Sequence, residues 1–167
     1  MIIVRRAGDL DARDMADLLN AIIRKGGTTA LTTPVTREAI SARFRQEQGR
    51  SAWHVAEDDS GKILGFQSIG PHHALPPEAC DIATFVRLGV TGLGIGSALF
   101  DASRIAATAL SYHWINATIR ADNAGGLAYY QSRGFEPYVL QKGITLEDGT
   151  LVDKISTRFA LDQSLSG

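Results

Sequence analysis

Apolar residues recur with the period of an α-helix in two stretches of the chain. The first stripe consists of Met15, Leu18, Leu19, Ile22 and Ile23. The second consists of Ile95, Ala98, Leu99, Ala102, Ile105, Ala106, Ala109 and Leu110. Spacings of three and four residues place such side chains on one face of a helix. The pattern therefore predicts one helix over about 11–25, ended by Gly26-Gly27, and another over about 95–110.

Two further helices are predicted from signals at their ends. Thr36 can cap the first turn of a helix that runs to about Gln48. Another helix is expected over about 123–133, because Gly134 followed by Phe135 is typical of a left-handed helix end with an apolar residue after it.

Short runs of β-forming residues predict the strands. These runs cover residues 2–6, 52–57, 62–69, 80–88, 113–120, 136–142 and 151–160. Turn signals at 58–61 and 147–150 join two pairs of strands into antiparallel hairpins. The strands at 80–88 and 113–120 are separated by a helix and are expected to be parallel. The sequence thus predicts one α/β (α+β) domain over 1–167, with a mixed sheet of about seven strands flanked by about four helices.

The charge, hydrophobicity and cysteine content of the chain argue against several classes of function. The chain has 167 residues, of which 44% are hydrophobic and 21% charged, and its net charge is -1. A nucleic-acid partner is not expected, because such proteins normally carry a basic excess. No apolar run reaches 18 residues, so neither a membrane span nor a secretory signal is expected. Cys80 is the only cysteine, which excludes an internal disulfide and favours a reducing cytoplasm.

The sequence gives little support for a metal site or for a catalytic cysteine. The adjacent pair His72-His73 lacks the spacing of two ligands on one face, and we expect no metal site. Cys80 has no accompanying histidine and asparagine frame, so it is interpreted as a small buried residue rather than a nucleophile.

Closely spaced glycines precede the helix at 95–110. The backbone at Gly92, Gly94 and Gly96 could approach an anion closely and direct unpaired N–H groups at it. Phosphate is the anion most often bound in this way. A dinucleotide fingerprint starting at Gly92 would need glycine where Ser97 stands, and the lysine of a Walker A loop is missing. Two alternatives stay open, a glycine-rich turn that merely packs closely and another kind of nucleotide-binding loop.

Two motifs resemble the GCN5-related N-acetyltransferases (GNAT). The first is the segment Thr91-Gly92-Leu93-Gly94-Ile95-Gly96, which resembles the family's pyrophosphate loop and lies five residues after Val86. The second is the set Asn123, Gly126, Tyr130, Gly134 and Phe135. The sequence departs from the family pattern at Thr91, where Arg or Gln is usual, and at Gly126, where Ala is usual. The resemblance covers roughly residues 1–140.

The resemblance implies that acetyl-CoA is the cosubstrate and that the strands at 80–88 and 113–120 splay apart around it. The residues that it assigns to the cosubstrate are Val86, Thr91, Gly92, Leu93, Gly94, Ile95, Gly96, Ser97, Asn123, Gly126 and Tyr130. It further implies that Tyr130 gives a proton to the departing thiolate, and that a backbone N–H near Val86 stabilises the developing oxyanion. The ordinary structural explanation of Tyr130 is a core tyrosine.

An amine must lose a proton to attack a thioester, so a proton acceptor is needed. Asp81 begins the strand that leads to Val86 and is the best-placed carboxylate, with Glu78 and His72 as rivals. Segments around Thr29, His72 and Asp81 look similar to the phosphinothricin N-acetyltransferase-like branch. That likeness implies a small, amino-acid-like primary amine as the acceptor, with these three residues at its site.

The expected function is therefore N-acetyl transfer to a small-molecule amine by direct attack, in a cytoplasmic protein. The family also implies a possible homodimer, and the last hairpin offers an edge strand for it. A second hypothesis is a non-catalytic acyl-CoA sensor or protein-interaction module on the same fold. Acetyl-CoA binding without thiol release would favour that second hypothesis.

Overall fold

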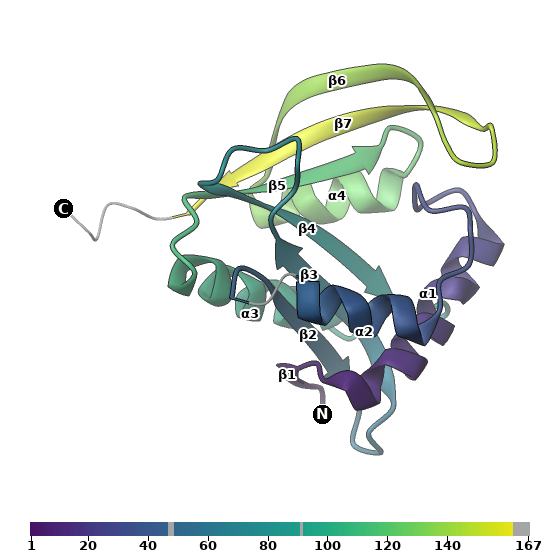
Figure 1. The fold of residues 1–167 in the computed structure, drawn as a ribbon, viewed down its shortest axis with the longest axis vertical. Helices are drawn as coiled ribbons and strands as arrows, with labels where there is room; N and C mark the ends of the chain where they lie inside the picture. The colour runs from purple at the N-terminus through teal and green to yellow at the C-terminus, as the bar shows by residue number, and fades with distance from the viewer. Residues whose placement is uncertain (47–48, 91, 162–167) are drawn as a thin grey trace.

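The computed structural model describes residues 1–46, 49–90 and 92–161. Within them the strands and helices follow one another in the order that the sequence patterns predict (Figure 1). In chain order the elements are β1 Ile3–Arg6, a 3-10 turn Asp9–Asp11, α1 Ala12–Lys25, α2 Arg37–Gln46, β2 Ala52–Glu57, β3 Ile63–Gly70, β4 Ala79–Val86, α3 Ile95–Ala109, β5 Trp114–Arg120, α4 Ala124–Arg133, β6 Glu136–Thr145 and β7 Leu151–Ala160.

The described strands form one mixed seven-stranded sheet in the order β1-β2-β3-β4-β5-β7-β6. All neighbouring pairs are antiparallel except β4 and β5, which are parallel as predicted. The fold class and the parallel pair are thus confirmed.

Helices cover both faces of the sheet. The apolar stripe of α1 packs with Ile40 of α2 on Val55 and Phe66. On the other face, Phe100 of α3 and Tyr130 of α4 pack on Ile115 and other residues of the central strands. In the described residues, no helix is long and apolar enough to cross a membrane.

The predicted helix ends follow from local hydrogen bonds. Thr36 Oγ1 accepts from the Ala39 N–H at 3.1 Å and caps α2. Gly134 has φ 107°, and the Phe135 N–H reaches back to the Tyr130 carbonyl oxygen at 3.0 Å, which closes α4 as predicted. The expected end of α2 near Gln48 lies outside the described residues.

Two strand ends differ from the predicted ones by two residues or more, and one turn was not predicted. β4 ends at Val86 rather than Leu88, because the chain turns away toward the glycine loop. β6 continues to Thr145, beyond the predicted end at 142, because it pairs with β7 past a register shift. The turn before α1 was not predicted; its Asp11 carboxylate accepts from Arg5 and from the Gly8 N–H, a contact that depends on β1 lying alongside.

Candidate active site

The sheet splits where β4 and β5 diverge. Their pairing is limited to Ala79–Asp81 against Trp114–Asn116, after which β4 follows β3 and β5 follows β7. Figure 1 shows the two arrowheads well apart. The sheet is therefore split on the C-terminal side of Asp81, as the family resemblance implies.

Backbone groups of β4 face this gap. The Arg87 N–H donates to the Leu64 carbonyl oxygen of β3 at 2.8 Å. Because backbone groups alternate in direction along a strand, the N–H groups of Thr84 and Val86 point to the opposite side, toward β5. The described part of β5 does not pair with β4 at that level. These amides are placed to donate to a group that enters the split.

The glycine loop leads directly into α3. Gly92 and Gly94 both have φ 74°, which favours glycine. Gly94 is the residue before the helix and provides no side-chain cap, while its carbonyl oxygen accepts from the Ala98 N–H at 3.0 Å. The amides of residues 95–97 belong to the first turn and have no partner within the helix. Thr91 lies outside the described residues.

A second feature adds positive charge beside these amides. Arg133 of α4 donates to Ser97 Oγ, and its guanidinium lies over the Tyr129 ring, 5.7 Å from the centroid. A Cβ at Gly96 would lie 2.6 Å from Tyr129 Cε1, so the close approach of this ring requires glycine there. The first turn of α3 therefore presents backbone N–H groups and a nearby guanidinium, a combination that favours anions.

Tyr130 is nearly enclosed, with 7% of its surface exposed. Its hydroxyl lies 2.8 Å from Thr84 Oγ1 on β4, at the split. Burial raises the pKa of the Tyr130 phenol above its ordinary value, and the hydrogen bond with Thr84 opposes that rise. Tyr130, the predicted acid, is therefore buried in the core, and its hydroxyl also contacts β4 beside the split in the sheet.

Asn123 and Gly126 have a local explanation in addition to the predicted ligand contact. Asn123 Oδ1 accepts from the Gly126 N–H at 3.0 Å and caps α4, and its Nδ2 donates to the Thr28 carbonyl oxygen at 3.1 Å. A Cβ at Gly126 would lie 2.5 Å from Asn123 Nδ2 and 3.2 Å from Ile119. An alanine at 126 would therefore require the Asn123 side chain, which caps α4, to shift.

Asp81 lies at the closed end of the split. Asn116 Nδ2 donates to Asp81 Oδ1 at 2.9 Å and to Thr118 Oγ1 at 3.0 Å, while the Tyr138 hydroxyl donates to Asn116 Oδ1. Burial raises the pKa of the Asp81 carboxyl, against the hydrogen bond from Asn116 and the positive charges of His72 and Arg43. A carboxylate with a raised pKa is better suited to accept a proton.

Two other residues, His72 and Thr29, were predicted to share the acceptor site with Asp81, and only His72 lies near it. His72 is close enough for a positive charge on its ring to lower the pKa of Asp81, and the His72 ring stacks on His73 with centroids 4.4 Å apart. Thr29 lies elsewhere: its carbonyl oxygen accepts from Arg120 at 3.1 Å, at the far end of β5. Asn116 and Arg120 are four residues apart on this strand, or roughly 13 Å. Thr29 therefore lies at the open end of the split.

Cys80, next to Asp81, is completely buried. Burial raises the pKa of its thiol to about 12, so a thiolate does not form near neutral pH. This agrees with the interpretation of Cys80 as a small core residue.

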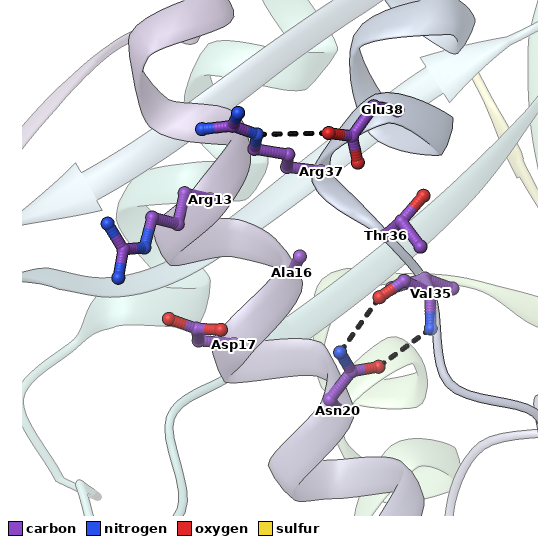
Figure 2. Close-up of a pocket in the computed structure, with 8 residues that line it drawn as sticks. All are labelled: Arg13, Ala16, Asp17, Asn20, Val35, Thr36, Arg37 and Glu38. Atoms are coloured by element: carbon purple, nitrogen blue, oxygen red, sulfur yellow. Dashed lines mark hydrogen bonds and ion pairs between the residues drawn. The ribbon is translucent and has the colours of Figure 1, made fainter.

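A surface hollow between α1 and the start of α2 contains none of the predicted site residues (Figure 2). In it, the side-chain amide of Asn20 pairs with the backbone of Val35 through two hydrogen bonds of 2.8 Å. This pairing fixes the segment that connects α1 and α2, whose other end contacts β5 and α4 through Thr28 and Thr29.

Comparisons with known proteins assign the fold to a family. The family model described as "Acetyltransferase (GNAT) domain" matches residues 49–137, more than half of the chain. The chain belongs to the GNAT acetyltransferases. This GNAT protein is 31% identical over 137 residues to a phosphinothricin N-acetyltransferase of Streptomyces coelicolor, covering 79% of this chain and 80% of that one. YwnH of Bacillus subtilis is 26% identical over 152 residues, covering 90% and 93%.

Solved GNAT structures have the same fold. A phosphinothricin acetyltransferase from Sinorhizobium meliloti in complex with AcCoA superposes with a TM-score of 0.87 at 21% identity, covering 99% of this chain and 91% of that one. The GNAT reaction is transfer of acetyl from acetyl-CoA to an amine, and it is the activity of this chain.

Sequence motifs did not mark Thr84, Asn116 or Tyr138. Thr84 contacts Tyr130, Asn116 contacts Asp81, and Tyr138 contacts Asn116. Of these three residues, only Thr84 could have been proposed from the sequence, because it lies two residues before Val86 on the strand that was assigned to the cosubstrate.

Proposed function

We propose that the acceptor is a small primary amine that carries a carboxylate, and that Asp81 and Tyr130 are the base and the acid of its acetylation. The observation that carries this proposal is the placement of the two groups at the split in the sheet. Tyr130 contacts β4 at Thr84, and Asp81 lies on the same strand where pairing with β5 ends.

Acetyl-CoA supplies an activated acetyl group, and the chain's own residues do the rest. The first-turn amides of α3 hold the pyrophosphate, with Arg133 beside them. Asp81 accepts the proton that the amine loses as it attacks, and the Val86 N–H donates to the carbonyl oxygen as negative charge develops on it. Tyr130 then gives its proton to the departing thiolate. The inert thiol of Cys80 supports direct attack without an acylated cysteine.

Arg158 supports an anionic acceptor. Arg158 is opposite Asn116 in the β5–β7 register, so its side chain is on the same face as Asn116. It is exposed, and its guanidinium lies over the Trp114 ring, 5.7 Å from the centroid. In the part of the chain that the structure describes, it forms no ion pair with a carboxylate. The Streptomyces coelicolor relative is named for phosphinothricin, and the resemblance to that branch also implies an amino-acid-like amine.

Thiol release from acetyl-CoA tests this proposal. With amines supplied in matched pairs, free amino acids and the corresponding amino acid amides, we expect kcat/KM to be at least about fivefold higher for the acids, since one charged pair contributes more than about 1 kcal/mol when partly desolvated. The assay is a spectrophotometric thiol titration over a panel of such pairs.

Arg158→Gln provides the control. It should remove the preference for the acids and leave the KM for acetyl-CoA unchanged. Thiol release that is equal for acids and amides in the unsubstituted protein would contradict the anionic acceptor. Acetyl-CoA binding with no thiol release from any amine would favour the sensor hypothesis instead.

We also propose that the protein is a cytoplasmic homodimer that pairs through β6. This strand is at the edge of the sheet and exposes Val139 and Leu140, the latter at 56%. Light scattering should give twice the chain mass of 17.9 kDa. Leu140→Lys should give the mass of one chain, whereas Ile105→Lys, at an exposed position of α3, should not change the mass. A single-chain mass for the unsubstituted protein at micromolar concentration would contradict the dimer.

A further inference from the structure

The side chain of Thr84 lies between the sheet and the phenol of Tyr130. Its Oγ1 is 2.8 Å from the Tyr130 hydroxyl and accepts from Gln67 Nε2 at 2.8 Å. Gln67 is opposite Thr84 on β3 and is completely buried. Neither Thr84 nor Gln67 belongs to a motif of the family resemblance, yet together they connect the core of the sheet to the proposed acid.

The direction of these hydrogen bonds is fixed by a backbone carbonyl. Tyr129 donates its only hydroxyl hydrogen to the Gly96 carbonyl oxygen at 2.7 Å, because a carbonyl can only accept. The Tyr129 oxygen can therefore only accept from Gln67, at 3.1 Å, which orients the Gln67 amide with Nε2 toward both hydroxyl groups. The same Nε2 then donates to Thr84 Oγ1, so the hydrogen of the Thr84 hydroxyl is free to point toward Tyr130.

This arrangement matters most after Tyr130 has lost its proton. A phenolate oxygen has no hydrogen to donate, so the Thr84 hydroxyl must then be the donor of the bond between the two oxygens. Hydrogen bonds to a charged oxygen are roughly twice as strong as those between neutral groups. Since burial raises the pKa of Tyr130, this donor offsets part of the cost of forming the phenolate.

We propose that Thr84 is a positioning residue for the acid step: it donates to the Tyr130 oxygen and directs the phenol hydrogen toward the split between β4 and β5. The proposal rests on the proposed role of Tyr130. When the carbon–sulfur bond breaks, its electron pair stays on sulfur; the Tyr130 O–H bond then breaks and an S–H bond forms. The proton that the amine loses goes to Asp81. Both side chains return to their starting protonation by exchange with solvent.

Thr84→Val is the decisive variant, because valine keeps the branched shape and strand preference of threonine but has no hydroxyl. We expect kcat to fall about tenfold, the size of one charge-assisted hydrogen bond, with the KM for acetyl-CoA changed less than about twofold. Thr84→Ser keeps the hydroxyl and should restore kcat to within about threefold. In the Tyr130→Phe background, Thr84→Val should have almost no further effect on kcat, since the oxygen it serves is gone.

The outcomes separate this inference from the proposed function. Full turnover of Thr84→Val, or an equal loss for Thr84→Val in the Tyr130→Phe background, would overturn the role of Thr84. The second result is the one that a merely structural role of Thr84 predicts. Full turnover of Tyr130→Phe would instead overturn the proposed acid itself. Thermal unfolding of both Thr84 variants identifies any loss that comes from folding.

Discussion

Replacement of Asp81 by asparagine is expected to lower kcat/KM by about 100-fold or more, because general base catalysis contributes on the order of 10²–10⁴. Asparagine keeps an oxygen that can accept from Asn116, so the network through Tyr138 is preserved while the proton acceptor is lost. The measurement is the initial rate of thiol release as a function of amine concentration, which gives kcat/KM. Glu78→Gln and His72→Gln test the rival bases, and a larger loss in either variant than in Asp81→Asn would contradict the assignment.

The same substitution should not destabilise the protein. Burial raises the pKa of the Asp81 carboxyl, so the folded state binds this proton more tightly than the unfolded state does. The stability linked to that proton is present below the unfolded pKa and is lost as the pH rises through the folded pKa. At neutral pH the carboxylate therefore destabilises the fold, and asparagine removes this cost. A melting temperature at pH 7 equal to or above that of the unsubstituted protein is the expected result.

The pH profile gives a second readout for Asp81. In the unsubstituted protein, kcat should fall on the acid side as Asp81 becomes protonated, at a pH above the ordinary range of an aspartic acid. In Asp81→Asn this acid limb should disappear from the residual activity. An unchanged limb would show that another group gives rise to it.

Tyr130→Phe is the second change with a large expected effect. We expect kcat to fall about 100-fold, with the dissociation constant of acetyl-CoA changed less than about threefold, because the lost proton transfer occurs only as the thiolate departs. Thr84 keeps its hydrogen bond from Gln67, so the strand is not left with an unpaired hydroxyl oxygen. Stopped assays of thiol release give kcat, and calorimetry gives the affinity.

Tyr129→Phe is the matched control. Tyr129 is adjacent to Tyr130, with ring centroids 4.9 Å apart, and its hydroxyl forms hydrogen bonds with Gln67 and Gly96. Its loss should change kcat much less than the loss of the Tyr130 hydroxyl. Equal losses in the two variants would mean that the cluster acts as packing, and that Tyr130 is not the proton donor.

The local signals in the sequence predicted the fold because each depends on residues close together in the chain. The stripe from Met15 to Ile23 is set by the helical period, and Gly134 adopts φ 107° where the predicted helix ends. The glycine loop likewise belongs to one continuous segment, so its position before α3 could be predicted. For the same reason the resemblance to GNAT proteins rests on these segments.

The surroundings of Asp81 and Tyr130 could not be predicted, because they are made between distant segments. Asp81 meets Asn116 across 35 residues, and Tyr130 meets Thr84 across 46. Tyr138 reaches Asn116 from β6, even though β7 lies between β5 and β6 in the sheet. Which side chains become neighbours depends on strand order and register, and neither is encoded in local spacing.

By itself, the sequence determined the elements, their order and the position of the glycine loop before α3, because periodicity, glycine conformation and helix capping act within a few residues. The tertiary structure decided where the sheet splits, that Asn116 and Thr84 contact the two proposed catalytic groups, and that Thr29 lies away from Asp81. The physical reason is that a hydrogen bond or a shifted pKa requires groups within a few ångströms of each other, and only the packed sheet brings these groups together.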